Sequence, residues 1–357
     1  LLFIASVYLF MQKPKFGKAP SGERLKRIQQ SPHYRDGQFQ NESHTPSLTE
    51  GASYVGIMSK FLFGRNKNGK PTDSIPVKKI NLHQLDANED VLVWFGHSSY
   101  FIQLEGKKIL VDPVLSGSAS PVRFTTRSFA GSDAYTAADL PAIDYLLITH
   151  DHWDHLDYSI LQELKPRIKR IITGLGTGAH LEHWGFSPSI ITEADWYETV
   201  SLEDGFVINT APARHFSGRG FKRNQALWLS FVLQTPRYKL YLGGDSGYDN
   251  HFKKMGEKHG PFDLAILENG QYDKAWKYIH MMPEEVVTAA RDLKAKKLMA
   301  VHWGKFTLAN HNWNEPIERV YKASQQQQLP LLTPMIGEPI HLNDTLKQFD
   351  TWWEKLR

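Results

Sequence analysis

The sequence predicts an α/β protein whose β-sheets are covered by helices on their outer faces. Two observations lead to this fold class. Short apolar runs first follow one another closely, as strands in hairpins do, and later runs are mixed with helical stretches. With 357 residues, of which 41% are hydrophobic, the chain is long enough to bury a sizeable core.

Composition narrows the functional classes. The balance of 42 Lys and Arg against 38 Asp and Glu leaves a net charge of +4, too small to indicate a nucleic-acid partner, and we expect none. The chain has no cysteine, which excludes disulfides and thiolate metal ligands. Any metal would therefore be held by His and carboxylate side chains, and the 16 His make such chemistry worth seeking.

The N-terminal segment, residues 1–30, begins with an almost wholly apolar run from Leu1 to Met11. This run is shorter than the roughly 20 residues that cross a bilayer. Because the sequence starts at Leu rather than Met, we expect upstream residues that would complete a membrane anchor or signal, although a disordered leader or a packed strand would also fit. The basic stretch that follows suits anionic lipid headgroups, so we predict membrane association through this segment, on a side of the membrane that stays open.

Residues 31–84 are polar, with scattered Pro and Gly and no sustained period, and are expected to form an extended arm packed on the core. The main domain is expected over 85–345 and a C-terminal tail over 346–357. Its first strands are predicted over 91–95, 99–104 and 107–112, and the last two are joined by a Glu105-Gly106 hairpin turn.

A second set of strands follows in the main domain, mixed with helical stretches. The helix predicted over 283–296 has Pro283 at its first position and two Glu in its first turn. The apolar runs that predict the strands are 143–149, 170–173, 205–210, 226–234, 238–244, 262–268 and 297–303.

Potential metal ligands follow four of these runs. The run that ends at Thr149 leads directly into HDHWDH, which holds His150, His152, Asp154 and His155. Three further runs end at His215, Asp245 and His302. Since sheet proteins bring ligands together at strand ends, we expect all of these side chains to share one site.

The spacing of the ligands favours two metal ions. His150 and His152 point the same way if the chain stays extended, because alternate residues share a face. Asp154 and His155 follow a turn and do not easily join that pair on one ion. Seven N and O donors suit two borderline ions with open positions for water, about 3.5 to 4 Å apart. Asp245, after the Gly243-Gly244 turn, is the best candidate for a bridging carboxylate.

The motifs also carry a family resemblance. HxHxDH followed by His, Asp and His at strand ends resembles the metallo-β-lactamase superfamily. The segments GHSSYFIQL, ILVDPVLSGSASPV, LGGDSGY, GPFDLAILENGQYD, MMPEEVV and MAVHWGKFTLANHNWNEP are similar to its N-acyl-phosphatidylethanolamine-hydrolysing phospholipase D branch, over 91–316. The resemblance implies an αββα sandwich of two mixed β-sheets flanked by helices, with the metal site at one edge of the sheets.

The resemblance also implies a ligand set and a reaction. Two Zn²⁺ would be bound, one by His150, His152 and His215 and the other by Asp154, His155 and His302, with Asp245 bridging. A metal-bridged hydroxide would attack the phosphodiester, expel the N-acylethanolamine and leave phosphatidic acid.

Further residues are assigned roles with alternatives. Asp151 or a metal-bound water is expected to manage protons. His280 matches a His near the substrate phosphate, where it would stabilise charge or protonate the leaving oxygen, and is otherwise a surface His before a helix. His97 and Asp112 are expected to orient ligands, or else to cap a turn and end a strand.

Substrate contacts are the least determined part of the site. Gln271, Tyr272 and Trp276, with Tyr278, are expected to line an acyl groove, although aromatic clusters are more often plain core. The basic residues around the fifth ligand, His215, either contact phosphate or only solvate a loop: Arg214, Arg219, Lys222 and Arg223.

Three functional readings are compared. The first is a zinc phosphodiesterase acting on an N-acylated phospholipid at a membrane surface, and the second is a lactonase or other carboxylic-ester hydrolase on the same metal scaffold. The third is a membrane-associated binding protein that has lost catalysis, which the complete ligand set opposes. The oligomeric state stays open, and a homodimer is one possibility.

The run Gly174-x-Gly176-x-Gly178 lacks the glycine spacing of a dinucleotide-binding loop.

Overall fold

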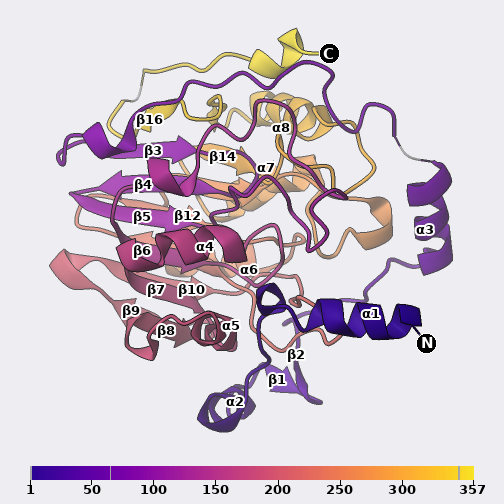
Figure 1. Cartoon of the computed structure of the whole chain (residues 1–357). Coiled ribbons are helices and arrows are strands. Elements are labelled where there is room, and N and C mark those ends of the chain that lie inside the picture. Colours follow the sequence, from indigo (N-terminus) through magenta and orange to yellow (C-terminus); the bar gives the residue numbers. More distant parts are fainter. Residues whose placement is uncertain (1, 65, 345) are drawn as a thin grey trace.

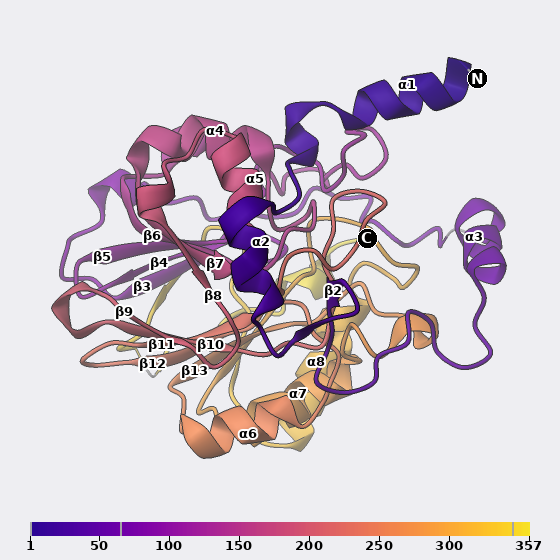
Figure 2. The same cartoon turned by 90° about the horizontal axis from the view of Figure 1, so that it is seen from below.

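The computed structural model describes residues 2–64, 66–344 and 346–357. Two seven-stranded mixed β-sheets pack face to face, and helices cover their outer faces (Figures 1 and 2). The predicted αββα fold is therefore confirmed. The helices are α1 (Leu2–Met11), α2 (Gly22–Gln29), α3 (Tyr54–Phe63), α4 (Tyr158–Leu164), α5 (Gly178–His183), α6 (His251–Lys258), α7 (Pro283–Asp292) and α8 (Glu315–Gln326).

The first sheet has the strand order β16-β3-β4-β5-β6-β7-β8. Pairs from β16 to β5 are antiparallel and pairs from β5 to β8 are parallel. Helices α4 and α5 lie on its outer face (Figure 2). Its strands are β16 (Pro339–His341), β3 (Val91–Trp94), β4 (Tyr100–Leu104), β5 (Lys107–Val111), β6 (Ile143–Ile148), β7 (Ile168–Gly174) and β8 (Ile191–Ala194).

The second sheet has the strand order β15-β14-β13-β12-β11-β10-β9. It is antiparallel from β9 to β12 and parallel from β12 to β15, and α6, α7 and α8 cover its outer face (Figure 2). Its strands are β15 (Leu331–Leu332), β14 (Leu298–Val301), β13 (Leu264–Glu268), β12 (Lys239–Leu242), β11 (Ser230–Gln234), β10 (Val207–Ala211) and β9 (Thr199–Ser201).

The core has one apolar layer on each face of the first sheet. Along β3, Leu92 and Trp94 belong to the apolar cluster between the sheets, whereas Val91 and Val93 belong to the cluster beneath the outer helices. Successive side chains of a strand point to opposite faces, so a strand covered on both faces is apolar throughout. This is why the strand runs of the sequence are continuous rather than alternating.

Local turn chemistry follows the sequence closely at the β4–β5 hairpin. Glu105 and Gly106 both have positive φ, 48° and 79°, as a two-residue turn matched to the twist of the strands requires. The helix expected over 283–296 is shorter, because it ends at Asp292 and Lys294 takes a φ of 57°.

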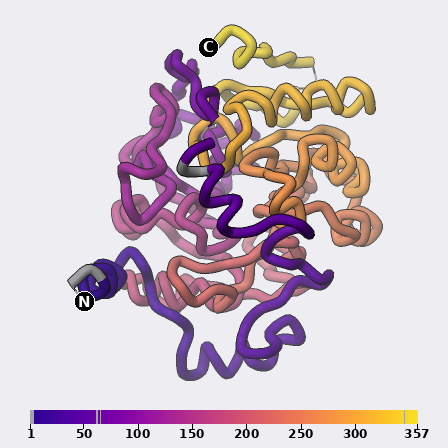
Figure 3. The backbone as a smooth tube through the Cα atoms, turned by 90° about the vertical axis from the view of Figure 1, so that its right-hand side faces the viewer, coloured from indigo at the N-terminus to yellow at the C-terminus, as the bar shows by residue number. Residues whose placement is uncertain are grey.

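The N-terminal segments lie at one end of the sandwich. Helix α1 is neither a strand nor a disordered leader, and it projects on the same side as α3 (Figures 1 and 2). The arm of residues 31–84 contains the short hairpin of β1 (Tyr34–Arg35) and β2 (Gln38–Phe39), and also α3, which the sequence analysis did not predict. Figure 3 shows this arm running across that end of the molecule. Within the described ranges, no helix has both the length and the apolar character needed to cross a membrane.

The C-terminal tail packs on the main domain. Trp352 and Trp353 are buried, and the ring of Trp352 stacks on Trp303 at 5.3 Å. The carbonyl of Arg357 accepts a hydrogen bond from the backbone N–H of Thr72 at 2.6 Å. The tail thereby joins the N-terminal arm to the core.

Candidate metal centre

The predicted ligands meet at the edge of the two sheets where several strands end. The residues after β6 supply His150, His152, Asp154 and His155. His215, Asp245 and His302 follow β10, β12 and β14 and are buried. Gly244, just before Asp245, permits this approach, since a Cβ there would lie 2.5 Å from the carbonyl oxygen of Leu229.

The first ligand group consists of three imidazoles. Nδ1 of His152 lies 3.0 Å from Nε2 of His150 and 3.2 Å from Nε2 of His215. Nitrogens bound tetrahedrally to one Zn²⁺ lie about 3.3 Å apart, given Zn–N bonds of about 2.05 Å. The three ring nitrogens therefore converge as ligands of a single ion do.

The second ligand group lies on the other side of Asp245. It contains Asp154, His155 and His302 together with His97, and their ligand atoms lie within 4.8 Å of one another. Nε2 of His155 is 3.6 Å from Oδ2 of Asp154. Nε2 of His97 donates to the same oxygen at 3.0 Å, which orients the carboxylate.

Asp245 lies between the two groups. Its Oδ2 atom is 3.8 Å from Nε2 of His150, 3.8 Å from Nε2 of His215 and 3.2 Å from Nε2 of His155. Its Oδ1 atom is 3.2 Å from Nδ1 of His302. One carboxylate thus reaches members of both groups, the position that a bridging ligand occupies.

Neighbouring side chains and carbonyls fix the orientation of the ligand rings. Nδ1 of His155 donates to Asp112 at 2.8 Å, and Nδ1 of His215 donates to the carbonyl of Ile279 at 2.9 Å. Each bond leaves Nε2 free for a metal ion. Ser98 Oγ lies 2.9 Å from Nδ1 of His302.

Electrostatics favour an ion at this site. Burial lowers the pKa of His150, His215 and His302 well below the usual range, so these rings are neutral. Burial acts to raise the pKa of Asp245, but His155 and His302 outweigh it and hold that pKa well below the usual value. Oδ1 of Asp245 and Nε2 of His155 are buried without a hydrogen bond. For His150, His215, His302 and Asp245 these are the protonation states in which metals bind. Burial acts to lower the pKa of His155, but Asp245 and Asp154 outweigh it and raise that pKa well above the usual value, so a metal ion at this ring displaces a proton.

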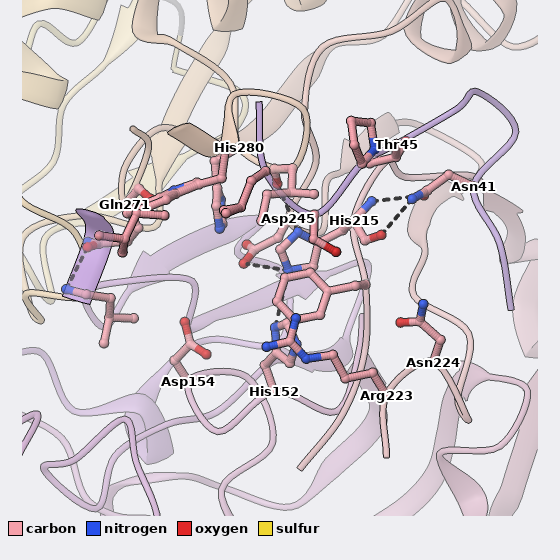
Figure 4. Close-up of a pocket in the computed structure, with 18 of the residues that line it drawn as sticks. Asn41, Thr45, His152, Asp154, His215, Arg223, Asn224, Asp245, Gln271 and His280 are labelled. Atoms are coloured by element: carbon pink, nitrogen blue, oxygen red, sulfur yellow. Dashed lines mark hydrogen bonds and ion pairs between the residues drawn. The ribbon is translucent and has the colours of Figure 1, made fainter. Parts of the chain in front are cut away.

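A cavity of about 380 Å³ opens onto this centre (Figure 4). Its apolar lining residues include Leu48 and Ile57 of the N-terminal arm, with Trp276, Ile279 and Leu308. His152, Asp154, His215, Asp245 and His302 also line it, and other lining residues are Asn41, Thr45, Tyr54, Phe216, Arg223, Asn224, Gln271 and His280.

His280 faces the cavity beside both ligand groups. Its ring centroid is 5.0 Å from that of His215 and 5.2 Å from that of His302. Nδ1 of His280 lies 3.7 Å from Oε2 of Glu268, which is fully buried at the end of β13. Burial acts to lower the pKa of His280, but Glu268 outweighs it and raises that pKa.

Asp151, considered for a proton-handling role, is not among the described residues that line this cavity. It accepts hydrogen bonds from Nε2 of His180 at 3.2 Å and from the N–H of Gly218 at 2.6 Å. Because alternate residues of an extended chain point to opposite sides, Asp151 faces away from its neighbours His150 and His152. Its contacts indicate a structural role.

Two of the four residues predicted to line an acyl groove lie in the cavity lining. Gln271 and Trp276 line the cavity, but Tyr272 and Tyr278 are not among its described lining residues. The ring of Tyr272 stacks on His311 at 4.7 Å and its hydroxyl donates to Glu315 at 2.8 Å, so packing against α8 draws it away. Gln271 Oε1 accepts from the N–H groups of Leu308 and Ala309, which holds that loop in place.

Sequence reasoning missed three residues at the site. Asn41 of the arm brackets His215, accepting from its N–H at 3.0 Å and donating to its carbonyl at 2.8 Å. Nothing in the polar arm signals this contact. Ser98 is the neighbour of His97, which was expected to orient a ligand. Glu268 ends a predicted strand, as the ligands do. The position of each residue in the sequence therefore indicated the site.

Comparison with known proteins is consistent with this site. Residues 107–303 match the family model described as a beta-lactamase superfamily domain. An uncharacterised protein of Mycobacterium tuberculosis is 36% identical over 329 residues, which cover 91% of this chain and 88% of that protein. The N-acyl-phosphatidylethanolamine-hydrolyzing phospholipase D 1 of Caenorhabditis elegans is 33% identical over 254 residues, or 66% of this chain and 70% of that one.

A solved structure shows the same fold. The fold matches that of a metallo hydrolase from Ignicoccus hospitalis with a TM-score of 0.56 and 20% identity, covering 71% of this chain and 98% of the other.

Proposed function

The chain belongs to the beta-lactamase superfamily and is a metal-dependent hydrolase, and we propose that it cleaves the phosphodiester bond of an N-acylated phospholipid such as N-acyl-phosphatidylethanolamine. The products are an N-acylethanolamine and phosphatidic acid. One observation carries this proposal: members of both ligand groups, with Asp245 between them, line a cavity that also has apolar lining residues. A phosphodiester at the ligand groups and an acyl chain against the apolar residues fit that lining.

The ligand groups are proposed to hold two Zn²⁺. His150, His152 and His215 would hold one ion, Asp154, His155 and His302 would hold the other, and Asp245, which lies between the two groups, would be shared. Bound zinc supplies a water of lowered pKa and polarises a phosphoryl oxygen. His97 and Asp112 keep Asp154 and His155 in the orientation that the ions need.

His280 is proposed to act on the leaving group. Its ring faces the cavity next to both ligand groups, and the buried carboxylate of Glu268 raises its pKa. A protonated imidazole in this place donates its proton to the oxygen that departs with the N-acylethanolamine. Gln271 and Trp276 border the same space and position the substrate beside it.

Membrane association is proposed to bring the cavity to its substrate. Helices α1 and α3 project on one side of the molecule, and they carry exposed apolar side chains. On α3, Tyr54 and Ile57 also line the cavity, so this helix joins the cavity to that apolar side. Ile4, Tyr8 and Leu9 on α1 and Tyr54, Val55, Met58 and Phe63 on α3 are the exposed residues concerned. Lys13 and Lys18, which follow α1, suit anionic headgroups.

The reaction is tested by product analysis. Purified protein of measured metal content is incubated with N-acyl-phosphatidylethanolamine and, separately, with a panel of lactones, and His152→Ala serves as the control without a complete ligand group. Release of N-acylethanolamine and phosphatidic acid by the intact protein alone supports the proposal. Two bound metals with lactone opening only would keep the metal site and reject the substrate.

The membrane proposal has a separate test. Val55→Asp and Met58→Asp place charges on the exposed side of α3, and both are expected to reduce co-sedimentation with anionic phospholipid vesicles. Leu346→Asp, at an equally exposed apolar residue of the C-terminal tail, is the matched control. Equal sedimentation of all variants would reject this surface as the contact.

A further inference from the structure

The loop after His215 carries basic side chains whose surroundings differ sharply. Arg219 is buried and donates to the carbonyls of Asp151, Leu156 and Lys15, while its guanidinium lies 3.9 Å from the ring centroid of Trp153. It fastens the metal-ligand loop to the N-terminal segment. Its guanidinium makes four hydrogen bonds within the protein.

The guanidinium of Arg214 is likewise bonded within the protein. It donates to Thr45 Oγ1 at 3.0 Å and to the carbonyl of His44 at 2.7 Å, and it lies 3.8 Å from Asp249. These contacts hold the N-terminal arm along the cavity. Lys222, in contrast, is exposed on the loop.

Arg223 is held at the cavity by an aromatic ring. Its guanidinium lies 4.8 Å from the ring centroid of Phe216. That ring in turn packs on His152 at 4.5 Å and on His215 at 4.7 Å, so the guanidinium stands one ring away from the first ligand group. Figure 4 shows Arg223 extending toward His152 across the cavity. Stacking on a ring restricts a guanidinium while leaving its N–H donors free.

No described carboxylate lies within ion-pair distance of Arg223, whereas Arg214 and Arg219 are paired or hydrogen-bonded. It lines the cavity together with Asn41, Thr45 and Asn224, whose side chains add polar groups on the same side. Arg223 is exposed, like Lys222, but it stacks on a ring and lines the cavity beside the ligand groups. A guanidinium in this place is suited to an oxyanion because its planar fork matches a phosphate.

We propose that Arg223 binds the anionic phosphate group of the substrate and thereby selects anionic phosphodiesters over neutral esters. This rests on the proposed function for the choice of phosphodiester, but the recognition of an oxyanion rests on Arg223 and Phe216 themselves. A lactone carries no charge for the guanidinium to meet. A metal centre by itself would accept both anionic phosphodiesters and neutral esters. The side chain of Arg223 therefore distinguishes these two substrate classes.

The direct test measures anion binding rather than turnover. Inorganic phosphate is titrated by calorimetry into metal-loaded protein, comparing the wild type with Arg223→Ala, Arg223→Lys and Lys222→Ala. The dissociation constant is expected to rise about tenfold in Arg223→Ala, less in Arg223→Lys, which keeps the charge but not the fork, and not at all in Lys222→Ala. Equal dissociation constants for wild type and Arg223→Ala, or no phosphate binding by the wild type, would overturn the proposal.

The ring that carries Arg223 gives a second variant. Phe216→Leu keeps an apolar side chain but removes the stacking surface, and it is expected to weaken phosphate binding by part of the Arg223→Ala effect. Metal content is measured for each variant, because Phe216 contacts two ligand rings. Weaker phosphate binding at full metal content supports the arrangement, whereas unchanged binding would reject the role of the ring.

Two further arms separate the possible sources of phosphate and the proposed function. If Arg223 instead met headgroups of the bilayer surface, Arg223→Ala would reduce co-sedimentation with anionic vesicles and leave the binding of soluble phosphate unchanged, which contradicts the proposal. In turnover, Arg223→Ala is expected to lower kcat/KM for an anionic phosphodiester about tenfold and to leave a lactone unaffected. If the wild type cleaves no phosphodiester, the proposed function fails, but the calorimetric result still decides the role of Arg223.

Discussion

The Oδ2 atom of Asp112 lies 2.8 Å from Nδ1 of His155 and accepts a second bond from the hydroxyl of Thr149 at 2.6 Å. The other oxygen of Asp112 accepts from the N–H of Thr149 at 2.9 Å. The buried carboxylate of Asp112, directly after β5, thus joins Thr149, the residue after β6, to the ligand ring of His155. His155 is held with Nε2 toward Asp245, 3.2 Å away.

Replacing Asp112 is expected to weaken metal binding. Asp112→Asn keeps the shape of the side chain but removes the charge that fixes the ring of His155, and metal affinity should fall about 10- to 100-fold. Chelator competition measures the affinity. Asp144→Asn is the control, because Asp144 lies on β6 and pairs with Lys169 near the surface. Unchanged affinity in Asp112→Asn would show that the ring is held by other contacts.

Asp245→Ala is expected to reduce the binding of both metal ions, because this carboxylate reaches His150 and His215 on one side and His155 on the other. The metal content of the purified protein should fall from the proposed two ions per chain to less than one. Asp263→Ala, which removes a carboxylate paired with Lys296, should leave the count unchanged. Retention of one ion at wild-type affinity would assign Asp245 to one group only.

Loss of Asn41 is expected to release the N-terminal arm. Asn41→Ala removes both hydrogen bonds to the backbone of His215 and the bond from Nε1 of Trp228 to Asn41 Oδ1 at 2.9 Å. The free energy of unfolding in urea should decrease by about 2 kcal/mol, and backbone amides of residues 42–48 should exchange with deuterium faster. The exposed turn residue Asn88, as Asn88→Ala, is the control. Unchanged exchange would mean that other contacts hold the arm.

The stability of the protein is expected to depend on His251 as the pH falls. This ring is buried beside Ser246, 3.3 Å from its hydroxyl, and burial lowers the pKa of His251 to about 4. The unfolded chain takes up this proton first, so the stabilisation is complete above pH about 6.5 and is lost as the pH falls toward 4. The loss amounts to something on the order of 3 kcal/mol.

Urea unfolding of His251→Gln between about pH 7 and pH 4 checks this expectation, with a chelator present throughout so that metal release does not contribute. The variant takes up no proton here and should lose less stability than the wild type over that range. His183→Gln, at an exposed position, is the matched control. Equal pH dependence in His251→Gln and wild type would show that the ring titrates alike in both states.

The sequence alone determined the α/β class and the ligand candidates, and the resemblance carried by its motifs implied the sandwich. Apolar runs such as 143–149 predicted buried strands, and the positions of His215, Asp245 and His302 after such runs placed them at one edge. The Glu105-Gly106 turn followed from local chemistry as well. These features depend on continuous apolar runs and on the residues that directly follow them, and a sequence contains both in full.

Only the tertiary structure decided which side chains meet. Asp151 and Tyr272 stand next to site residues in the sequence but turn toward His180 and Glu315. Asn41 is far from His215 in the chain yet brackets it. Of the four basic side chains considered for the phosphate, Arg223 alone combines a place in the cavity lining with a ring that holds it. Such contacts join distant segments, and they are set by the packing of the arm and loops on the two sheets rather than by local spacing.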